Sequence, residues 1–349
     1  MRTSGIIFII LLLGFAAPPA VTTNEAQPKL RDNIPAVLWE DPGEIRSRDL
    51  YHGSGARELA PAPPFDFLEE DKQGASPKFM VKDARGVKWS VKMGPEAQAE
   101  VTATRLVWAV GYSTEETYYF ARVRINNLPR LSRGERYVEN GGVVRGVRFE
   151  ARRPEVERAE TWSWAKNPFA ATQELDGLRV LMIMLNSYDP KTSNNRVFIV
   201  YDPQDRRREA RYVVADLGAS LGRVGGIGAK RSKNNVEDFV SSRFVLGVED
   251  GMVRFDYDVG LKGFGWATIA YPPGFRKLRE KGRAMQDIPV PHAVWIGGHL
   301  ARLTTEQLHD AFRAANYDRA TATAYVKTLQ KRIRQLTRLS THEVAETPR

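Results

Sequence analysis

The sequence contains no cysteine, and this absence excludes several kinds of site at once. Disulfide bonds, cysteine-ligated metals, thiol nucleophiles and the lipid-anchored cysteine of a bacterial lipoprotein are all ruled out. Histidine is also scarce, and the five residues show no HExxH-type spacing: His52, His292, His299, His309 and His342. We therefore expect packing or surface roles for the histidines rather than a zinc site.

The chain is basic but has few features of a nucleic-acid-binding protein. Its formal net charge is +10, from 52 Lys and Arg against 42 Asp and Glu. Such an excess favours anionic partners, but no stripe of aromatic residues alternates with Arg and Lys as it does in single-strand binders. We therefore predict no nucleic-acid partner. With 349 residues, 42% hydrophobic and 27% charged, the chain is long enough for one large domain or for two lobes around a shared cleft.

The clearest targeting signal lies at the N-terminus. Arg2 precedes an apolar run from Ile6 to Ala17, which has the length of a signal-peptide core and is short for a membrane span. Small residues up to Ala20 offer cleavage sites. We predict a signal peptide over residues 1–22, with an uncleaved N-terminal anchor as the alternative. The predicted location is therefore exported, periplasmic or extracellular, with no membrane span after signal removal.

The rest of the chain alternates strand-like and helical segments. Residues 23–76 are rich in Pro, Gly and charge, which predicts an extended lead-in. Phe79–Lys92 predicts a β-hairpin that reverses at Asp83–Gly86, and helical periodicity predicts a helix over Glu96–Tyr112. Further strands are predicted at Tyr118–Ile125, Val197–Tyr201, Arg211–Ala215 and Phe239–Asp258, and further helices at Glu174–Leu185 and from Thr304 onward.

The polar residues between these elements match the needs of phosphoryl transfer. That reaction requires a cation on the phosphates, oxygen ligands for a metal ion, and a carboxylate that orients the attacking hydroxyl. In kinases these groups follow a fixed chain order: a strand lysine, a helix glutamate, an Asp with an Asn on the catalytic loop, and then the Asp of a DFG triplet. The sequence offers candidates in this order.

Lys92 ends the second strand of the predicted hairpin and is the candidate phosphate-binding cation. Glu96 and Glu100 follow it four residues apart, so both lie on one side of the next helix. Either glutamate fits as the ion-pair partner that fixes Lys92, and Glu100 is preferred. The alternative is a surface lysine with two solvated glutamates.

A second candidate follows the apolar helix, where Asp189, Lys191 and Asn194 form the pattern D-x-K-x-x-N. We predict that Asp189 orients the nucleophilic hydroxyl, that Lys191 steadies the transferring phosphoryl group, and that Asn194 helps to bind Mg²⁺. The alternative is a polar turn, because Asp, Pro, Ser and Asn all favour turns.

A third candidate is Asp216, which ends a hydrophobic strand and precedes Leu217 and Gly218. A carboxylate in this position is a natural metal ligand, and the alternative is a strand-terminating Asp in a turn. Residues 218–235 then form a Gly- and Lys-rich loop, which suits a mobile activation-type segment or, alternatively, an exposed flexible loop.

Over roughly Phe79 to Val259, these motifs resemble the protein-kinase-like superfamily. Ser187-Tyr188-Asp189 stands where the protein-kinase H-R-D would lie, and Asp216-Leu217-Gly218 is similar to D-F-G. The stretch from Lys92 to Glu100 looks more like the phosphatidylinositol 3/4-kinases, and secretory-pathway kinases of the Golgi casein kinase type are a looser relative in location. The sequence departs from the protein-kinase pattern in lacking a G-x-G-x-x-G before Lys92, so that only the Asp83–Gly86 turn is available to cover phosphates.

The resemblance implies an α+β, bilobed protein-kinase-like fold with a small β-rich N-lobe and a mainly helical C-lobe. It also implies ATP and Mg²⁺ as cofactors. The expected organisation is a signal peptide at 1–22, a lead-in at 23–76, an N-lobe at 77–130, a loop and strand insertion at 131–170, a C-lobe at 171–300, C-terminal helices at 301–340 and a tail at 341–349.

Three functions are compatible with these motifs. The first is an exported phosphotransferase that moves a phosphoryl group from ATP to a hydroxyl of a protein, glycan or lipid headgroup. The second is a catalytically inactive kinase-fold protein of the cell envelope that binds a nucleotide, an anion or a partner. The third is a non-enzymatic envelope protein in which the motif matches are coincidental. If either of the first two holds, then Lys92, Asn194 and Asp216 must converge in the folded chain.

Overall fold

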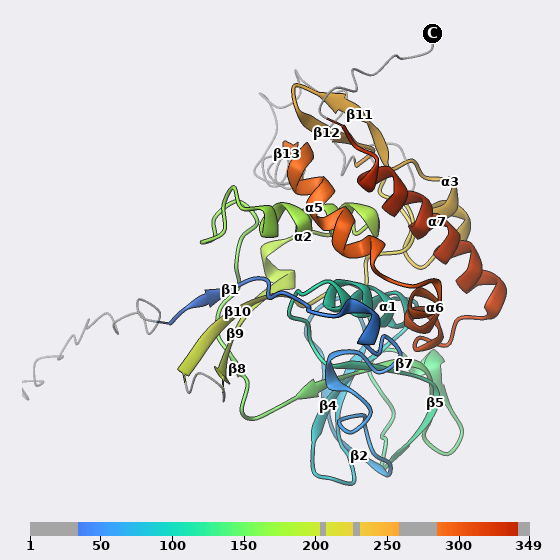
Figure 1. The fold of residues 1–349 in the computed structure, drawn as a ribbon. Coiled ribbons are helices and arrows are strands. Elements are labelled where there is room, and N and C mark those ends of the chain that lie inside the picture. The colour runs from blue at the N-terminus through green and yellow to red at the C-terminus, as the bar shows by residue number, and fades with distance from the viewer. Residues whose placement is uncertain (1–33, 203–206, 226–230, 258–284, 341–349) are drawn as a thin grey trace, which may run out of the picture. The chain divides into compact units, whose positions relative to one another are not determined.

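The computed structural model describes residues 34–202, 207–225, 231–257 and 285–340 (Figure 1). The expected signal peptide, the start of the lead-in and the C-terminal tail lie outside the described residues. The elements below all belong to the unit Pro35–Arg349. Within the described residues, no helix combines the length and the apolar composition needed to cross a membrane.

A six-stranded sheet and one helix form the N-terminal part of this unit. The strands are β2 (Phe65–Asp71), β3 (Lys78–Lys82), β4 (Lys88–Met93), β5 (Thr117–Asn126), β6 (Val138–Glu139) and β7 (Val143–Arg152). Their order is β4-β3-β2-β5-β7-β6, and β4 also pairs with β7, so that five of the strands close on themselves. Helix α1 (Glu96–Ala109) connects β4 to β5 and packs against β7.

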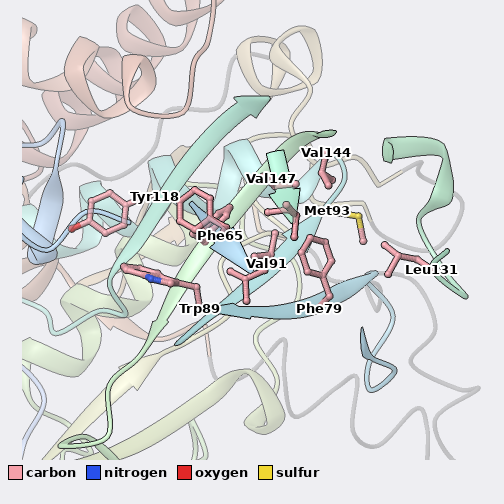
Figure 2. Close-up of a cluster of buried hydrophobic side chains, with 12 residues drawn as sticks. Phe65, Phe79, Trp89, Val91, Met93, Tyr118, Leu131, Val144 and Val147 are labelled. Atoms are coloured by element: carbon pink, nitrogen blue, oxygen red, sulfur yellow. The ribbon is translucent and has the colours of Figure 1, made fainter. Parts of the chain in front are cut away.

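The inner faces of these strands share one hydrophobic core (Figure 2). Phe65 from β2, Phe79 from β3, Trp89 and Val91 from β4, and Phe149 from β7 are all at most 1% exposed. Because side chains alternate along a strand, Lys92 and Ser90 of β4 point away from this core, toward α1 and the rest of the chain. The sheet therefore places Lys92 on the face opposite its core.

The C-terminal part is mainly helical. Its helices are α2 (Gln173–Met184), α3 (Val236–Ser241), α5 (Val290–Ala301), α6 (Thr305–Arg313) and α7 (Arg319–Thr337). Two small sheets accompany them. One contains β1 (Ala36–Val37), β8 (Glu157–Arg158), β9 (Asn195–Asp202) and β10 (Arg207–Val214), and the other contains β11 (Val245–Glu249), β12 (Met252–Phe255) and β13 (Ile288–Pro289). The predicted α+β class, with a β-rich N-lobe and a mainly helical C-lobe, is confirmed.

The element boundaries differ from the expected ones in two ways. The N-lobe sheet includes β2 within the expected lead-in and β7 within the expected insertion, because both strands contribute to the core of Figure 2. The sequence did not predict α5, and the start of the strand expected at 239–258 is helical in α3. Helix α5 is apolar and lies between α2 and α7, so it shows no simple amphipathic pattern.

Candidate active site

Lys92 lies at the point where the N-lobe sheet meets the C-lobe. It is the fifth residue of β4, directly opposite Lys78 of β3 and Arg148 of β7, and its side chain is only 4% exposed. Its Nζ lies 2.8 Å from Glu96 Oε2, 3.0 Å from Glu100 Oε2 and 3.2 Å from Asp216 Oδ1. A single buried ammonium is therefore surrounded by three carboxylates from two parts of the chain.

The start of α1 brings both glutamates to Lys92. Gly94 adopts a φ of +107°, which a residue with a side chain rarely adopts, and this allows the chain to turn from β4 into the helix within two residues. Glu96 and Glu100 are then one turn apart on the same face. The sequence left open which glutamate pairs with Lys92, and the structure places both within ion-pair distance.

Glu100 has a second cation partner that the sequence did not suggest. Its Oε1 lies 3.1 Å from Nη2 of Arg148, which is buried on β7 and also contacts Glu150. Glu100 itself is almost completely buried. Finding Arg148 requires the β4–β7 register, because Arg148 faces Lys92 across two strands that are distant in the sequence.

Mutual attraction sets the protonation of this cluster. Burial disfavours the charge on Lys92, but Glu100, Asp216 and Glu96 outweigh it, and its pKa lies above the ordinary value of 10.5. Burial likewise acts against ionisation of Glu96, yet Lys92, Lys233 and Ser76 lower its pKa to about 2. The pKa of Asp216 is also lowered, because Lys92 overcomes the cost of burial. The lysine and these two carboxylates are therefore charged at neutral pH.

The loop after α2 carries the next three candidates. Asn194 Nδ2 donates to the backbone oxygen of Asp189 at 3.0 Å and to its carboxylate at 3.2 Å, and Lys191 Nζ lies 2.6 Å from the same carboxylate. This loop ends in a short 3₁₀ turn (Thr192–Asn194) that leads into β9. The residues Asp189, Lys191 and Asn194 therefore form one connected group.

Asp216 joins this group to Lys92. The backbone oxygen of Asn194 accepts from the amides of Ala215 and Asp216, at 2.8 and 3.3 Å. Asp216 follows β10, and its Oδ1 accepts from the amide of Gly218 at 3.1 Å. Its side chain is 44% exposed, whereas that of Glu100 is 2% exposed. The residues Lys92, Asn194 and Asp216 thus converge, and Asp216 carries the most accessible of the three carboxylates.

The loop beside the candidate phosphate site is not the one that the sequence suggested. The Asp83–Gly86 turn lies at the far end of β3 and β4 from Lys92, since Lys82 pairs with Lys88 there. The β2–β3 connection, residues 72–77, lies at the Lys92 end, where Ser76 Oγ donates to Glu96 Oε2 at 2.8 Å. This connection contains Gly74 and Ser76, small residues that allow close approach of the backbone to a ligand, but it has no G-x-G-x-x-G pattern that would reveal it.

The donor set fits a magnesium ion that is held together with phosphates. Among the described residues, no group of three or more His, Cys, Asp or Glu side chains is placed to hold a metal alone. Asp216 offers an accessible carboxylate, and Asn194 offers its amide oxygen because its amide hydrogens donate to Asp189. Mg²⁺ typically uses one or two protein oxygens and completes its shell with substrate phosphates and water.

A separate cavity of about 300 Å³ is lined by none of the candidate site residues. Its lining includes Trp108 in the last turn of α1, Tyr112 just after that helix, Phe198 of β9 and Arg158 of β8. The chemistry suggested by Lys92 and Asp216 is therefore independent of this cavity.

No family model and no curated protein matches the sequence. Two solved structures are similar in fold. The Helicobacter pylori proinflammatory kinase CtkA is similar over 79% of this chain and 97% of its own, with 11% identity and a TM-score of 0.45. The Golgi casein kinase with Mn and ADP bound is similar over 82% of this chain and 75% of its own, with 11% identity and a TM-score of 0.38. Both likenesses are remote, and the functional assignment rests on the geometry described above.

Proposed function

We propose that this chain is an exported phosphotransferase that moves a phosphoryl group from ATP, with Mg²⁺, to a hydroxyl of a protein, glycan or lipid headgroup. The observation that carries the proposal is the convergence of Lys92, Glu100, Asn194 and Asp216, which come from distant parts of the chain. The proposed site of action is periplasmic or extracellular, on the basis of the N-terminal apolar run.

Each residue of the cluster has a role in this proposal. Lys92 binds the nucleotide phosphates as a fixed cation, and Glu100 with Glu96 holds its side chain in place. Asp216 and Asn194 would hold Mg²⁺, which neutralises charge on the phosphates when bound. The 72–77 connection lies beside Glu96 and would cover the phosphates from the sheet side.

Asp189 and Lys191 lie on the acceptor side of the proposed site. The Asp189 carboxylate is 29% exposed and is oriented by Asn194 and Lys191. It would accept a hydrogen bond from the acceptor hydroxyl and receive its proton as the oxygen attacks phosphorus. Lys191, which is 43% exposed, would stabilise charge on the transferring group.

The experiment that tests this function measures ATP binding and ADP formation by the purified protein with and without Mg²⁺. We expect Asp189→Asn to bind ATP normally but to lose turnover by about 10²–10⁴-fold, because a positioned base contributes that much. Asp250→Asn, in the β11–β12 turn, makes the same chemical change and should leave both measurements unaltered. Binding without turnover in the wild type would instead support the inactive, binding-only alternative, and absence of both would refute the proposal.

A further inference from the structure

Two consecutive residues near the end of the activation-type segment contact the first turn of α1. The Nζ of Lys233 forms an ion pair with Oε1 of Glu96, and Asn234 Nδ2 donates to Oε1 of Gln98 at 3.2 Å. Glu96 and Gln98 are the first and third residues of the helix. One dipeptide therefore contacts the turn of α1 that carries the carboxylate nearest to Lys92.

The first turn of α1 has no side-chain cap of its own. Its N-cap residue is Pro95, and no side chain caps the first backbone amides, so this turn lacks the usual polar anchor. Helix ends tend to fray, and the lack of a cap removes one source of stabilisation from this end. Contacts from outside the helix must therefore fix the positions of Glu96 and Gln98.

Besides Gln98, Asn234 contacts two further parts of the fold. Its backbone has a φ of +48°, a left-handed conformation that Asn tolerates better than most residues. Its amide donates to the oxygen of Ser220 at 2.9 Å, and its side-chain oxygen accepts from the hydroxyl of Tyr317 in the turn after α6. Gln98 also donates to the oxygen of Ala315 in that turn, at 3.0 Å.

The two oxygens of Glu96 serve different partners. Oε1 contacts Lys233, whereas Oε2 accepts from Ser76 and lies 2.8 Å from Lys92. Because Lys233 occupies Oε1, the carboxylate is fixed in a rotamer that presents one oxygen to Lys92. Lys92 Nζ also donates to Glu100 Oε2 and Asp216 Oδ1.

We propose that Lys233 and Asn234, together the 233–234 clamp, are positioning residues that hold the first turn of α1, and with it Glu96 and Glu100, against Lys92. The consequence for nucleotide affinity rests on the proposed function, whereas the effect on α1 does not. The clamp also couples the segment after Asp216 to the 72–77 connection, since both contact Glu96.

Hydrogen exchange of the nucleotide-free full chain tests the clamp directly. In Lys233→Met with Asn234→Ala, we expect the amides of the first two turns of α1 to exchange roughly tenfold faster, since a lost hydrogen bond to a charged group corresponds to about that factor. The single variant Lys233→Arg keeps a positive charge beside Glu96 and should keep most of the protection of these amides. Arg223→Met is the matched control, because Arg223 lies in the same segment but contacts Asp238 and Ser241 instead of α1.

Titration of the full chain with ATP in the presence of Mg²⁺ then measures the consequence for nucleotide affinity. We expect the double variant to bind about tenfold more weakly and Lys233→Arg to bind as the wild type does. Unchanged exchange of α1 in the double variant, or an equal increase in Arg223→Met, would overturn the clamp. Failure of the wild type to bind ATP would overturn the proposed function, and the exchange result would still decide whether the clamp holds α1.

Discussion

At the scale of single residues, Lys92 is surrounded by more negative charge than it neutralises. Glu96, Glu100 and Asp216 all lie within 3.2 Å of its Nζ, and Arg148 and Lys233 each contact one of these carboxylates from the other side. Asp216 is the member with substantial exposure. The positive and negative charges of this cluster are therefore balanced without a ligand, and the carboxylate of Asp216 is accessible to a cation.

Replacement of Lys92 tests how strongly this cluster depends on its cation. Lys92→Met leaves buried carboxylates without their shared partner, and we expect a loss of about 3–5 kcal/mol in the free energy of unfolding at pH 7. The loss should be smaller near pH 4, where protonation relieves the unpaired carboxylates. Urea unfolding at both pH values measures it. Lys88→Met, at the exposed first residue of the same strand, is the control, and equal losses in the two variants would contradict the account.

The lowered pKa of Glu96 leads to a second prediction, which concerns the stability of the fold in acid. Its pKa is about 2 in the folded chain and has an ordinary value of 4.5, so the ionised form stabilises the fold fully above about pH 4.5. This stabilisation is lost as the pH falls from about 4.5 through about 2. We therefore expect the urea midpoint of the wild type to decrease over this range, and to decrease less in Glu96→Gln.

Asp216, whose pKa is also lowered, retains part of the slope in that variant. Glu58→Gln, at an exposed position, is the matched control and should follow the wild type. A Glu96→Gln profile as steep as that of the wild type would show that Glu96 does not carry the acid dependence.

The sequence predicted the residues of this cluster where spacing or chain order was informative. Lys92, Glu96 and Glu100 lie within nine residues, and a helix places the two glutamates on one face. Arg148, Ser76 and Lys233 were not predicted, because their contacts depend on strand register and loop placement. A buried Arg on a strand and a Ser in a short loop have no local pattern that marks them as partners of a distant carboxylate.

At the scale of elements, α7 anchors the start of the loop that carries Asp189. Arg332 of α7 is buried and donates to the backbone oxygen of Met184, at the end of α2, and to Ser242 Oγ at 2.7 Å. It also lies 3.3 Å from Asn186 Oδ1. Burial lowers the pKa of Arg332 to about 9, well below the ordinary value, so the side chain is still charged at neutral pH.

Replacement of Arg332 should therefore make the region around the loop that carries Asp189 easier to unfold. Arg332→Met removes several charge-assisted hydrogen bonds, including the buried one to the backbone oxygen of Met184, and we expect a loss of about 3 kcal/mol or more in the free energy of unfolding. Lys331→Met, the exposed neighbour on the same helix, should lose little. Thermal unfolding compares the two, and similar melting temperatures would contradict the anchoring role.

Element prediction succeeded where hydrophobic periodicity or a cap was clear. The hairpin of β3 and β4, helix α1 and the helix that starts after Thr304 all match the expectation, and the last of these begins with a capping box of Thr304 and Gln307. Helix α5 was missed because its partners cover it on two sides, so its sequence has no polar face. Strand β7 was assigned to an insertion because Arg145, Arg148 and Glu150 interrupt its apolar residues, and the burial of Arg148 and Glu150 depends on ion pairs that only the fold supplies.

At the scale of the whole molecule, the helical C-terminal part covers the outer face of α1. Thr102 Oγ1 donates to the oxygen of Ala311 in α6 at 3.2 Å, and Gln98 donates to Ala315. Helix α1 is thus enclosed between the N-lobe sheet on one side and α6 on the other. This arrangement favours a fixed position of Glu100.

The overall class followed from the order of the motifs, but the closure of the sheet did not. The parallel pairing of β2 with β5 joins Phe65 to Ile125, and the β4–β7 pairing joins Lys92 to Arg148. Pairings between such distant residues are decided by how the core packs, since no turn fixes their register. For the same reason the sequence assigned the phosphate-covering role to the Asp83–Gly86 turn instead of to residues 72–77.

Calorimetric titration of ATP into the purified full chain, with and without Mg²⁺, is the most direct test of the central claim. The account predicts saturable binding that requires Mg²⁺ and is lost in Asp216→Asn, a change at an accessible side chain that should preserve the fold. It also predicts a stabilisation of about 2.7 kcal/mol when the nucleotide is present at about 100 times its Kd. No binding in the wild type, or Mg²⁺-dependent binding that persists unchanged in Asp216→Asn, would contradict it.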